Sequence, residues 1–194
     1  AKKTSATIGL AKASRNATLQ ETYGFYLFNR LDNYDYLGNP DILSESSWNV
    51  NIGADYKGDK LGVSGQLFGY FFENYIAGTK RADYSAMTIG ATGVKQYVNL
   101  DNATIAGAEV KLRYSIAKNL IVTSNNSFTY GLDDKGKALP LIPPFKSINS
   151  VKYGWKQILF NMTYTTGAVQ GHVDFEKYGE TASNEFNVLD ISIG

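Results

Sequence analysis

The chain of 194 residues is long enough for one domain, and its formal net charge of +1 gives no reason to expect a nucleic-acid or strongly acidic partner. The absence of cysteine excludes disulfide bonds, cysteine metal ligands and thiol catalysis. With a single histidine and no recognisable nucleophile–base set or phosphate loop, the sequence argues against an enzyme and indicates no cofactor.

Apolar and polar residues alternate along eight stretches of the chain, and a period of two predicts β-strands. The expected strands, in chain order, are residues 4–12, 47–57, 61–75, 97–116, 120–130, 145–153, 157–166 and 186–194. The second is the clearest, because Trp48, Val50 and Ile52 alternate with polar residues. The pattern therefore predicts an all-β, antiparallel protein.

The strand over 97–116 carries charge on one face only. From Thr104 to Tyr114 the even positions are small or apolar, whereas Glu109, Lys111 and Arg113 occupy odd positions. Opposite charges at this spacing can compensate one another across neighbouring strands. We therefore expect these three residues to form a charge ladder on the interior face of the sheet.

The connections between the expected strands alternate strictly in length. The long ones are residues 14–43, 77–93, 131–144 and 167–184, and the short ones are 58–60, 117–119 and 154–155. Outer-membrane barrels have short periplasmic turns and long extracellular loops, and strands of about ten residues can cross the bilayer when tilted. The loop pattern therefore favours such a barrel over a soluble sandwich.

Aromatic residues collect at the ends of the expected strands, as in the girdles at the two membrane interfaces. They are Trp48, Tyr56, Tyr75, Tyr114, Tyr130, Tyr153, Trp155 and Tyr164. No stretch is apolar over the roughly 20 residues that a transmembrane helix needs. The sequence predicts an antiparallel transmembrane β-barrel of the bacterial outer membrane, with its apolar face on lipid and its polar face towards the lumen.

Several motifs, in order along nearly the whole chain, resemble the barrel of TonB-dependent outer-membrane receptors. They are Glu21-x-Tyr23-Gly24-x-Tyr26-Leu27-Phe28, Tyr36-Leu37-Gly38-Asn39-Pro40-Asp41, Glu45-x-Ser47, Tyr97-x-Asn99-x-Asp101-x-Ala103-x-x-x-Gly107-x-Glu109, Pro140-x-Ile142-Pro143-Pro144, Gly179-Glu180 and Val188-Leu189-Asp190. The resemblance implies a 22-stranded barrel filled by an N-terminal plug. Residues 1–194 would be part of that single barrel domain, about eight strands of its C-terminal part, without the plug or the final strands.

Eight strands of a 22-stranded barrel cannot close at the family's diameter, so we expect open sheet edges. The resemblance also implies an active-transport receptor for a scarce nutrient, such as an iron–siderophore, haem or copper. Its expected partners are the TonB complex, reached through the plug, outer-membrane lipid, the metal chelate and, as in some members, a surface lipoprotein.

The candidate ligand contacts lie in the expected extracellular loops. They are Tyr23, Tyr26, Tyr34, Tyr36, Tyr84, Met87 and His172. The tyrosines of the first loop could stack on a planar ligand, although such residues more often fold a loop on itself or form the upper girdle. Met87 and His172 are soft ligands that suit copper, but they are too few to predict a metal site. For Glu109, Lys111 and Arg113 the functional alternative is contact with a moving plug.

Two other interpretations remain open from the sequence. A complete eight-stranded barrel would have its lumen filled by side chains, with a structural or adhesive role carried by its loops. A soluble carbohydrate-binding sandwich would require the apolar faces to pack against each other. The stop at Gly194 within an alternating pattern and the ordered motifs argue against the small barrel.

Overall fold

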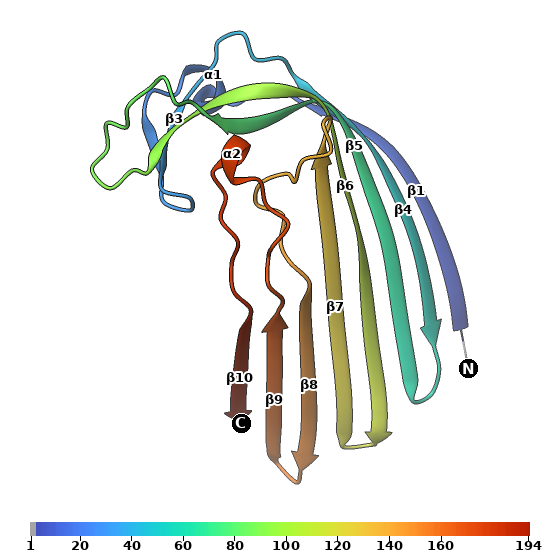
Figure 1. The fold of residues 1–194 in the computed structure, drawn as a ribbon. Coiled ribbons are helices and arrows are strands. Elements are labelled where there is room, and N and C mark those ends of the chain that lie inside the picture. Colours follow the sequence, from blue (N-terminus) through green and yellow to red (C-terminus); the bar gives the residue numbers. More distant parts are fainter. Residues whose placement is uncertain (1–2) are drawn as a thin grey trace.

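The computed structural model describes residues 3–194, which form one curved sheet with the long loops gathered at one end (Figure 1). Eight antiparallel strands follow one another across the sheet in chain order. They are β1 (Lys3–Arg15), β4 (Glu45–Lys57), β5 (Leu61–Lys80), β6 (Gly93–Ala117), β7 (Leu120–Asp133), β8 (Lys146–Trp155), β9 (Ile158–Gly167) and β10 (Phe186–Ile193). The predicted all-β, antiparallel fold is confirmed.

β1 and β10 are the two edges of the sheet built by residues 3–194. They do not pair with each other, so the alternative of a closed eight-stranded barrel is wrong for this part of the chain. Within the same residues, no helix is long and apolar enough to cross a membrane.

Short turns and long loops alternate as expected, with two corrections. The last short turn falls at 156–157 rather than at 154–155, because Trp155 pairs with Ile158 and Lys156 adopts a φ of 54°. Residues 77–80 are regular strand, since the pairing of β5 with β6 continues to Lys80 opposite Lys95. The long β5–β6 ribbon therefore rises above the other strands and carries part of the loop structure.

The first long connection, predicted as loop over 14–43, contains a short helix and two strands. They are α1 (Leu19–Tyr23), β2 (Leu27–Asn29) and β3 (Tyr34–Leu37). β3 pairs antiparallel with β2 and parallel with β6. All four residues of β3 are buried, so both of its faces are covered, and the alternation of Tyr34, Asp35 and Tyr36 does not separate a buried face from an exposed one. This is why the strand was missed.

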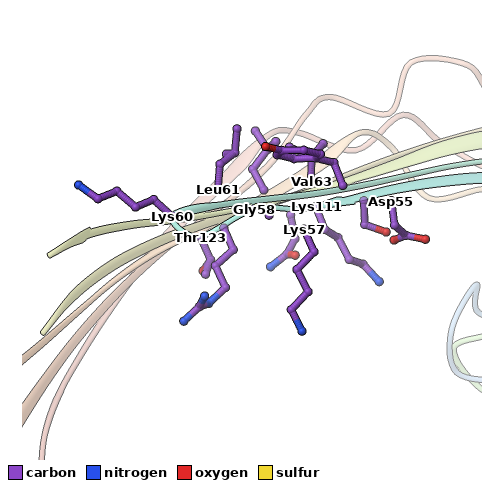
Figure 2. A pocket seen from close by; sticks show the side chains of 14 residues that line it. Asp55, Lys57, Gly58, Lys60, Leu61, Val63, Lys111 and Thr123 are labelled. Carbon is purple, nitrogen blue, oxygen red and sulfur yellow. The ribbon is translucent and has the colours of Figure 1, made fainter. Parts of the chain in front are cut away.

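Adjacent strands bring residues of one kind into rows across the sheet. One row consists of Asp55, Ser64, Lys111 and Asn125. The next row, on the opposite face, consists of Tyr56, Val63, Leu112 and Ser124. Figure 2 shows Lys111 projecting to one side of the sheet and Val63 to the other. We call the side of Lys111 the polar face and the side of Val63 the apolar face.

The alternation changes phase at Asn74, which has a φ of 54°. Phe72 pairs with Ala103, and Tyr75 pairs with Leu100. Residues three apart in a regular strand face opposite sides, yet Phe72 and Tyr75 both pack on the same hydrophobic core. Continued alternation from Leu67 and Phe71 predicts Tyr75 on the outward apolar face. That prediction is wrong, because the left-handed residue at 74 turns the upper part of β5 over.

That core lies where the long loops fold over the polar face. Its buried members are Ala77, Leu100, Ala103, Leu139, Ile142 and Tyr178. Three come from β5 and β6, and the other three from the loops at 134–145 and 168–185. Burial of apolar side chains at about 25 cal/mol per Å² is thus what fixes these loops against the sheet.

The same loops are joined by the buried carboxylate of Asp133, at the end of β7. Its Oδ1 accepts hydrogen bonds from the amides of Lys135 (2.9 Å) and Lys137 (2.8 Å). Its Oδ2 accepts from Lys177 Nζ (2.5 Å) and from the hydroxyl of Tyr178 (3.0 Å), both in α2 (Phe175–Tyr178). One side chain therefore closes its own turn and holds the helix of the last long loop.

Candidate functional site: a tyrosine-lined pocket under the long loops

A pocket of about 370 Å³ lies where three long loops meet β5 and β6. Its lining residues are Asn29, Asp32, Tyr36, Tyr75, Ile76, Ala77, Gly78, Lys95, Tyr97, Ile105, Pro140, Leu141, Ile142 and Glu180. The size falls within the range of small-molecule sites, and the lining combines apolar and aromatic walls with a few polar groups, as such sites do.

Tyrosine rings form one wall of the pocket. The centroids of Tyr36 and Tyr97 are 5.0 Å apart, and Tyr75 stands edge-on to Phe72 at 5.0 Å. The ring of Tyr36 lies directly on the backbone of β5, because a Cβ at Gly78 would stand 2.4 Å from its Cε1. The pocket therefore offers aromatic surface held in place by close packing.

A buried ion pair forms the polar end. Lys95 Nζ lies 2.5 Å from Asp32 Oδ2, and the Lys95 side chain is 3% exposed. The hydroxyl of Tyr36 donates to the same carboxylate oxygen at 2.7 Å. Burial, together with this hydrogen bond, raises the pKa of the Tyr36 phenol well above its ordinary value. Tyr36 is therefore a neutral hydrogen-bond donor at physiological pH, and the cation is compensated within the wall.

Glu180 contributes a second carboxylate from the last long loop. It accepts the amide hydrogen of Leu141, with its two oxygens 3.1 and 3.2 Å from the nitrogen. Burial raises the pKa of Glu180 above its usual value. The residue thus joins two loops at the edge of the pocket and has free acceptor capacity there.

Of the seven candidate ligand contacts, Tyr36 is the one that lines this pocket. Tyr34 is 3% exposed and does not line the pocket. Lys95 Nζ lies 4.3 Å from the centroid of the Tyr34 ring. Tyr26 is half-buried against Phe25. Three others are exposed on the loops outside the pocket: Tyr23, Tyr84 and Met87.

His172 lies away from the pocket. Its ring stacks on Tyr130 with centroids 4.3 Å apart. Tyr130 pairs with Ala106, in the same alternation as Leu112, and so belongs to the apolar face. His172 thus contacts β7, whereas the amide of Met87, the other residue that suggested a copper ligand set, is bound by Asp35 of β3.

Glu109, Lys111 and Arg113 lie on the polar face of β6. Glu109 and Lys111 form an ion pair at 3.7 Å along the strand. The expected compensation across strands is wrong, because the cross-strand neighbours of Glu109 are the neutral Gln66 and Ser127. Lys111 also lines a depression of about 480 Å³ near the short turns; Figure 2 shows its side chain among the others that line it.

The loop over 81–92 is docked beside the pocket by Asp35, which is fully buried in β3. Its Oδ2 accepts the amide hydrogens of Met87 (2.8 Å) and Thr88 (2.9 Å). Burial alone would raise the pKa of Asp35, but the hydrogen bonds from Thr88 and Met87 outweigh it and hold the pKa below its ordinary 3.8.

The pKa of Asp35 is lower in the folded than in the unfolded state. Its carboxylate therefore stabilises docking of the 81–92 loop above pH ~3.8, and this stabilisation is lost as the pH falls through the folded-state pKa. We expect amide exchange at Met87 and Thr88 to be slow at pH 6 and to accelerate, after correction for intrinsic rates, below pH 3.8. Asp35→Asn should exchange faster and show no such pH step. A step that persists in Asp35→Asn would assign the pH dependence to another group.

Sequence reasoning missed most of the pocket. In the sequence, Tyr97 and Glu180 stand out only as parts of the family motifs. The alternation along β5 predicts Tyr75 on the face of the sheet opposite to the pocket. Asp32 and Lys95 are far apart in sequence and meet only because β3 pairs with β6. The available signal was the run Asp32-Asn33-Tyr34-Asp35-Tyr36, whose polar–aromatic alternation is that of a strand.

Residues 3–194 match the family model described as TonB dependent receptor-like, beta-barrel. The ferrienterobactin receptor of Escherichia coli K12 is 27% identical over an alignment of 156 residues, which covers 74% of this chain and 20% of the relative. Among solved structures, the copper transporter OprC superposes with a TM-score of 0.81 at 20% identity. A ferric enterobactin receptor variant of Pseudomonas aeruginosa, in complex with enterobactin, gives 0.74 at 17%.

Each of these two structures covers 98% of this chain, which spans 28% and 30% of their respective lengths. At sequence identities of 20% and 17%, these superpositions show that the fold is shared. The family model covers the described chain from end to end, and the open, curved sheet with alternating short turns and long loops is what part of such a barrel requires. The chain therefore belongs to the TonB-dependent receptor family and forms part of its β-barrel.

Proposed function

We propose that this chain is part of an outer-membrane receptor that takes up a metal chelate by active transport. The observation that carries the proposal is the tyrosine-lined pocket beneath the long loops, at the end of the sheet where ligand would arrive. The names of the relatives support the same class, since they include a ferrienterobactin receptor and a copper transporter.

In this proposal the apolar face of β4–β7 contacts lipid, and the polar face lines the lumen. Large apolar residues on the apolar face are exposed in the isolated sheet, among them Ile52 (48%), Leu67 (57%) and Phe71 (51%). Exposed apolar side chains in this density require a nonpolar environment. The long loops would then be extracellular, and energy would come from TonB through parts of the receptor beyond residues 3–194.

The pocket favours an organic chelate over a bare ion. No group of three or more potential metal ligands of the His, Cys, Asp or Glu type occurs among residues 3–194. The cation of Lys95 is neutralised by Asp32, so the remaining groups are tyrosine rings, aliphatic side chains and hydrogen-bonding polar groups. Such a lining recognises the organic shell of a chelate through stacking and hydrogen bonds.

The test is ligand binding by the full-length receptor and by its Tyr97→Ala variant. Loss of one aromatic contact worth about 1–1.5 kcal/mol should weaken Kd roughly 5–10-fold. Binding of ferric tris-catecholate, ferric trihydroxamate, haem and Cu(II) would be measured by fluorescence quenching, and uptake with radiolabelled metal. Tyr84→Ala, an exposed tyrosine outside the pocket, is the matched control. Failure of the wild-type receptor to bind or import any of the four would overturn the proposal.

A further inference from the structure

Four aromatic rings form a continuous column on β5. Ring centroids are 5.5 Å apart between Phe68 and Tyr70, 6.4 Å between Tyr70 and Phe72, and 5.0 Å between Phe72 and Tyr75. These three steps place the rings of Phe68 and Tyr75 no more than about 17 Å apart. The column begins at Tyr75, which lines the tyrosine pocket, and runs down the polar face.

The lower half of the column has no packing role in the hydrophobic core. Phe72 and Tyr75 pack on that core, whereas Phe68 and Tyr70 do not. Phe68 lies among Asn51, Gly107 and other polar or small positions of its row. Two half-buried aromatic rings therefore interrupt a face that is otherwise polar.

The ring of Phe68 lies against the sheet, because β6 has a glycine beside it. A Cβ at Gly107 would stand 2.3 Å from Phe68 Cζ, so the ring occupies the space that a side chain would take. The Phe68 side chain is half-buried, so part of the ring remains exposed on the polar face. Exposed aromatic surface binds planar groups by stacking.

An unsatisfied acceptor accompanies the column. Asn49 pairs with Tyr70 across β4 and β5. Its Oδ1 is buried and has no hydrogen-bond partner among the described residues. Buried polar atoms are nearly always paired, so a donor group that reaches this oxygen when the side chains covering it move aside would satisfy it. The aromatic face and the acceptor together fit an aryl ring that carries an N–H or O–H donor.

We propose that Tyr75, Phe72, Tyr70 and Phe68 form a binding track along the inner wall, on which the aryl groups of a chelate stack as it leaves the pocket. This inference rests on the proposed function and adds a ligand class, chelates with aryl amide or phenolic groups. Several weak, adjacent sites suit transport, because a ligand must bind well enough to enter and weakly enough to leave.

The experiment uses the full-length receptor with Phe68→Ala and Tyr70→Ala. The probes are the gallium complex of a tris-catecholamide for equilibrium binding and its iron complex for uptake. Both variants should bind with a Kd within twofold of wild type, because the pocket is intact, while the initial uptake rate falls at least fivefold. Phe68→Tyr and Tyr70→Phe should retain the rate. Phe71→Ala, on the apolar face of the same strand, is the control.

The outcomes separate the track from the proposed function. Uptake by Phe68→Ala and Tyr70→Ala at the wild-type rate would overturn the track and leave the receptor function standing. If the wild-type receptor imports an aliphatic trihydroxamate but not the catecholamide, the track is likewise overturned and the receptor function stands. A wild-type receptor that imports no chelate would overturn both. A purely structural role predicts instead a lower unfolding midpoint in the alanine variants, with Kd weakened as much as the rate.

Discussion

Replacing Asp133 by alanine should detach the two last long loops from the sheet. The substitution removes the shared acceptor of four hydrogen bonds and leaves the cation of Lys177 and the buried hydroxyl of Tyr178 without their partner. Removing one member of a buried pair costs roughly 3–5 kcal/mol. We therefore expect amide exchange over 134–145 and 168–185 to accelerate by two to three orders of magnitude, at about 1.4 kcal/mol for each.

Asp134→Ala is the control for this variant, because its side chain is adjacent in sequence but exposed. It should leave exchange in both loops unchanged. Ligand affinity should also fall in Asp133→Ala, since Ile142 and Glu180 of the pocket come from these loops. Loops that stay protected in Asp133→Ala would show that the hydrophobic core around Leu139 holds them without the carboxylate.

Gly107→Ala should disrupt the sheet although it adds only one methyl group. The new Cβ would stand 2.4 Å from the carbonyl oxygen of Phe128 and 2.3 Å from the ring of Phe68. The ring can rotate, but the carbonyl belongs to the pairing of β6 with β7 and cannot move without breaking it. Overpacking typically costs about 1–3 kcal/mol, and a clash with backbone belongs at the upper end.

Gly65→Ala provides a matched comparison, because a Cβ at Gly65 meets nothing within 4 Å. Both variants would be assayed as full-length receptor, by the yield of folded, heat-modifiable protein and its midpoint of denaturation. Gly107→Ala should lower both, and Gly65→Ala should match wild type. Equal behaviour of the two variants would mean that β6 shifts to accommodate the methyl group without loss.

Period-two alternation predicted the eight main strands because in each of them one face is polar and the other apolar over most of the length. The sorting of connections by length predicted which end carries the loops. Both signals are local and repeat many times, so isolated exceptions such as Ile105 did not obscure them. The same reasoning failed at Lys156, where a lysine in the left-handed region ends the strand two residues beyond the glycine that seemed to mark the turn.

The pocket was harder to predict because its residues obey no single period. Tyr36 lies in a strand that is buried on both faces, and Lys95 becomes its neighbour only through a parallel pairing across more than fifty residues. The alternation predicts the wrong face for Tyr75, because the left-handed φ of Asn74 reverses the side of the sheet that the following residues of β5 face. Long-range pairing and single left-handed residues leave weak traces in sequence, and the site depends on both.

The reversal at Asn74 also divides the β5–β6 ribbon into two parts that are subject to different structural constraints. In the proposed placement, the strands below Asn74 and Asp101 span the lipid bilayer, whereas the same two strands above these residues contact the loops around the pocket. A chimera joined at Asn74 and Asp101 could therefore exchange the upper ribbon between receptors while every side chain below kept its orientation. Under the proposed function, ligand recognition would then diversify by recombination of the upper ribbon, while the membrane-spanning part of the sheet stayed unchanged.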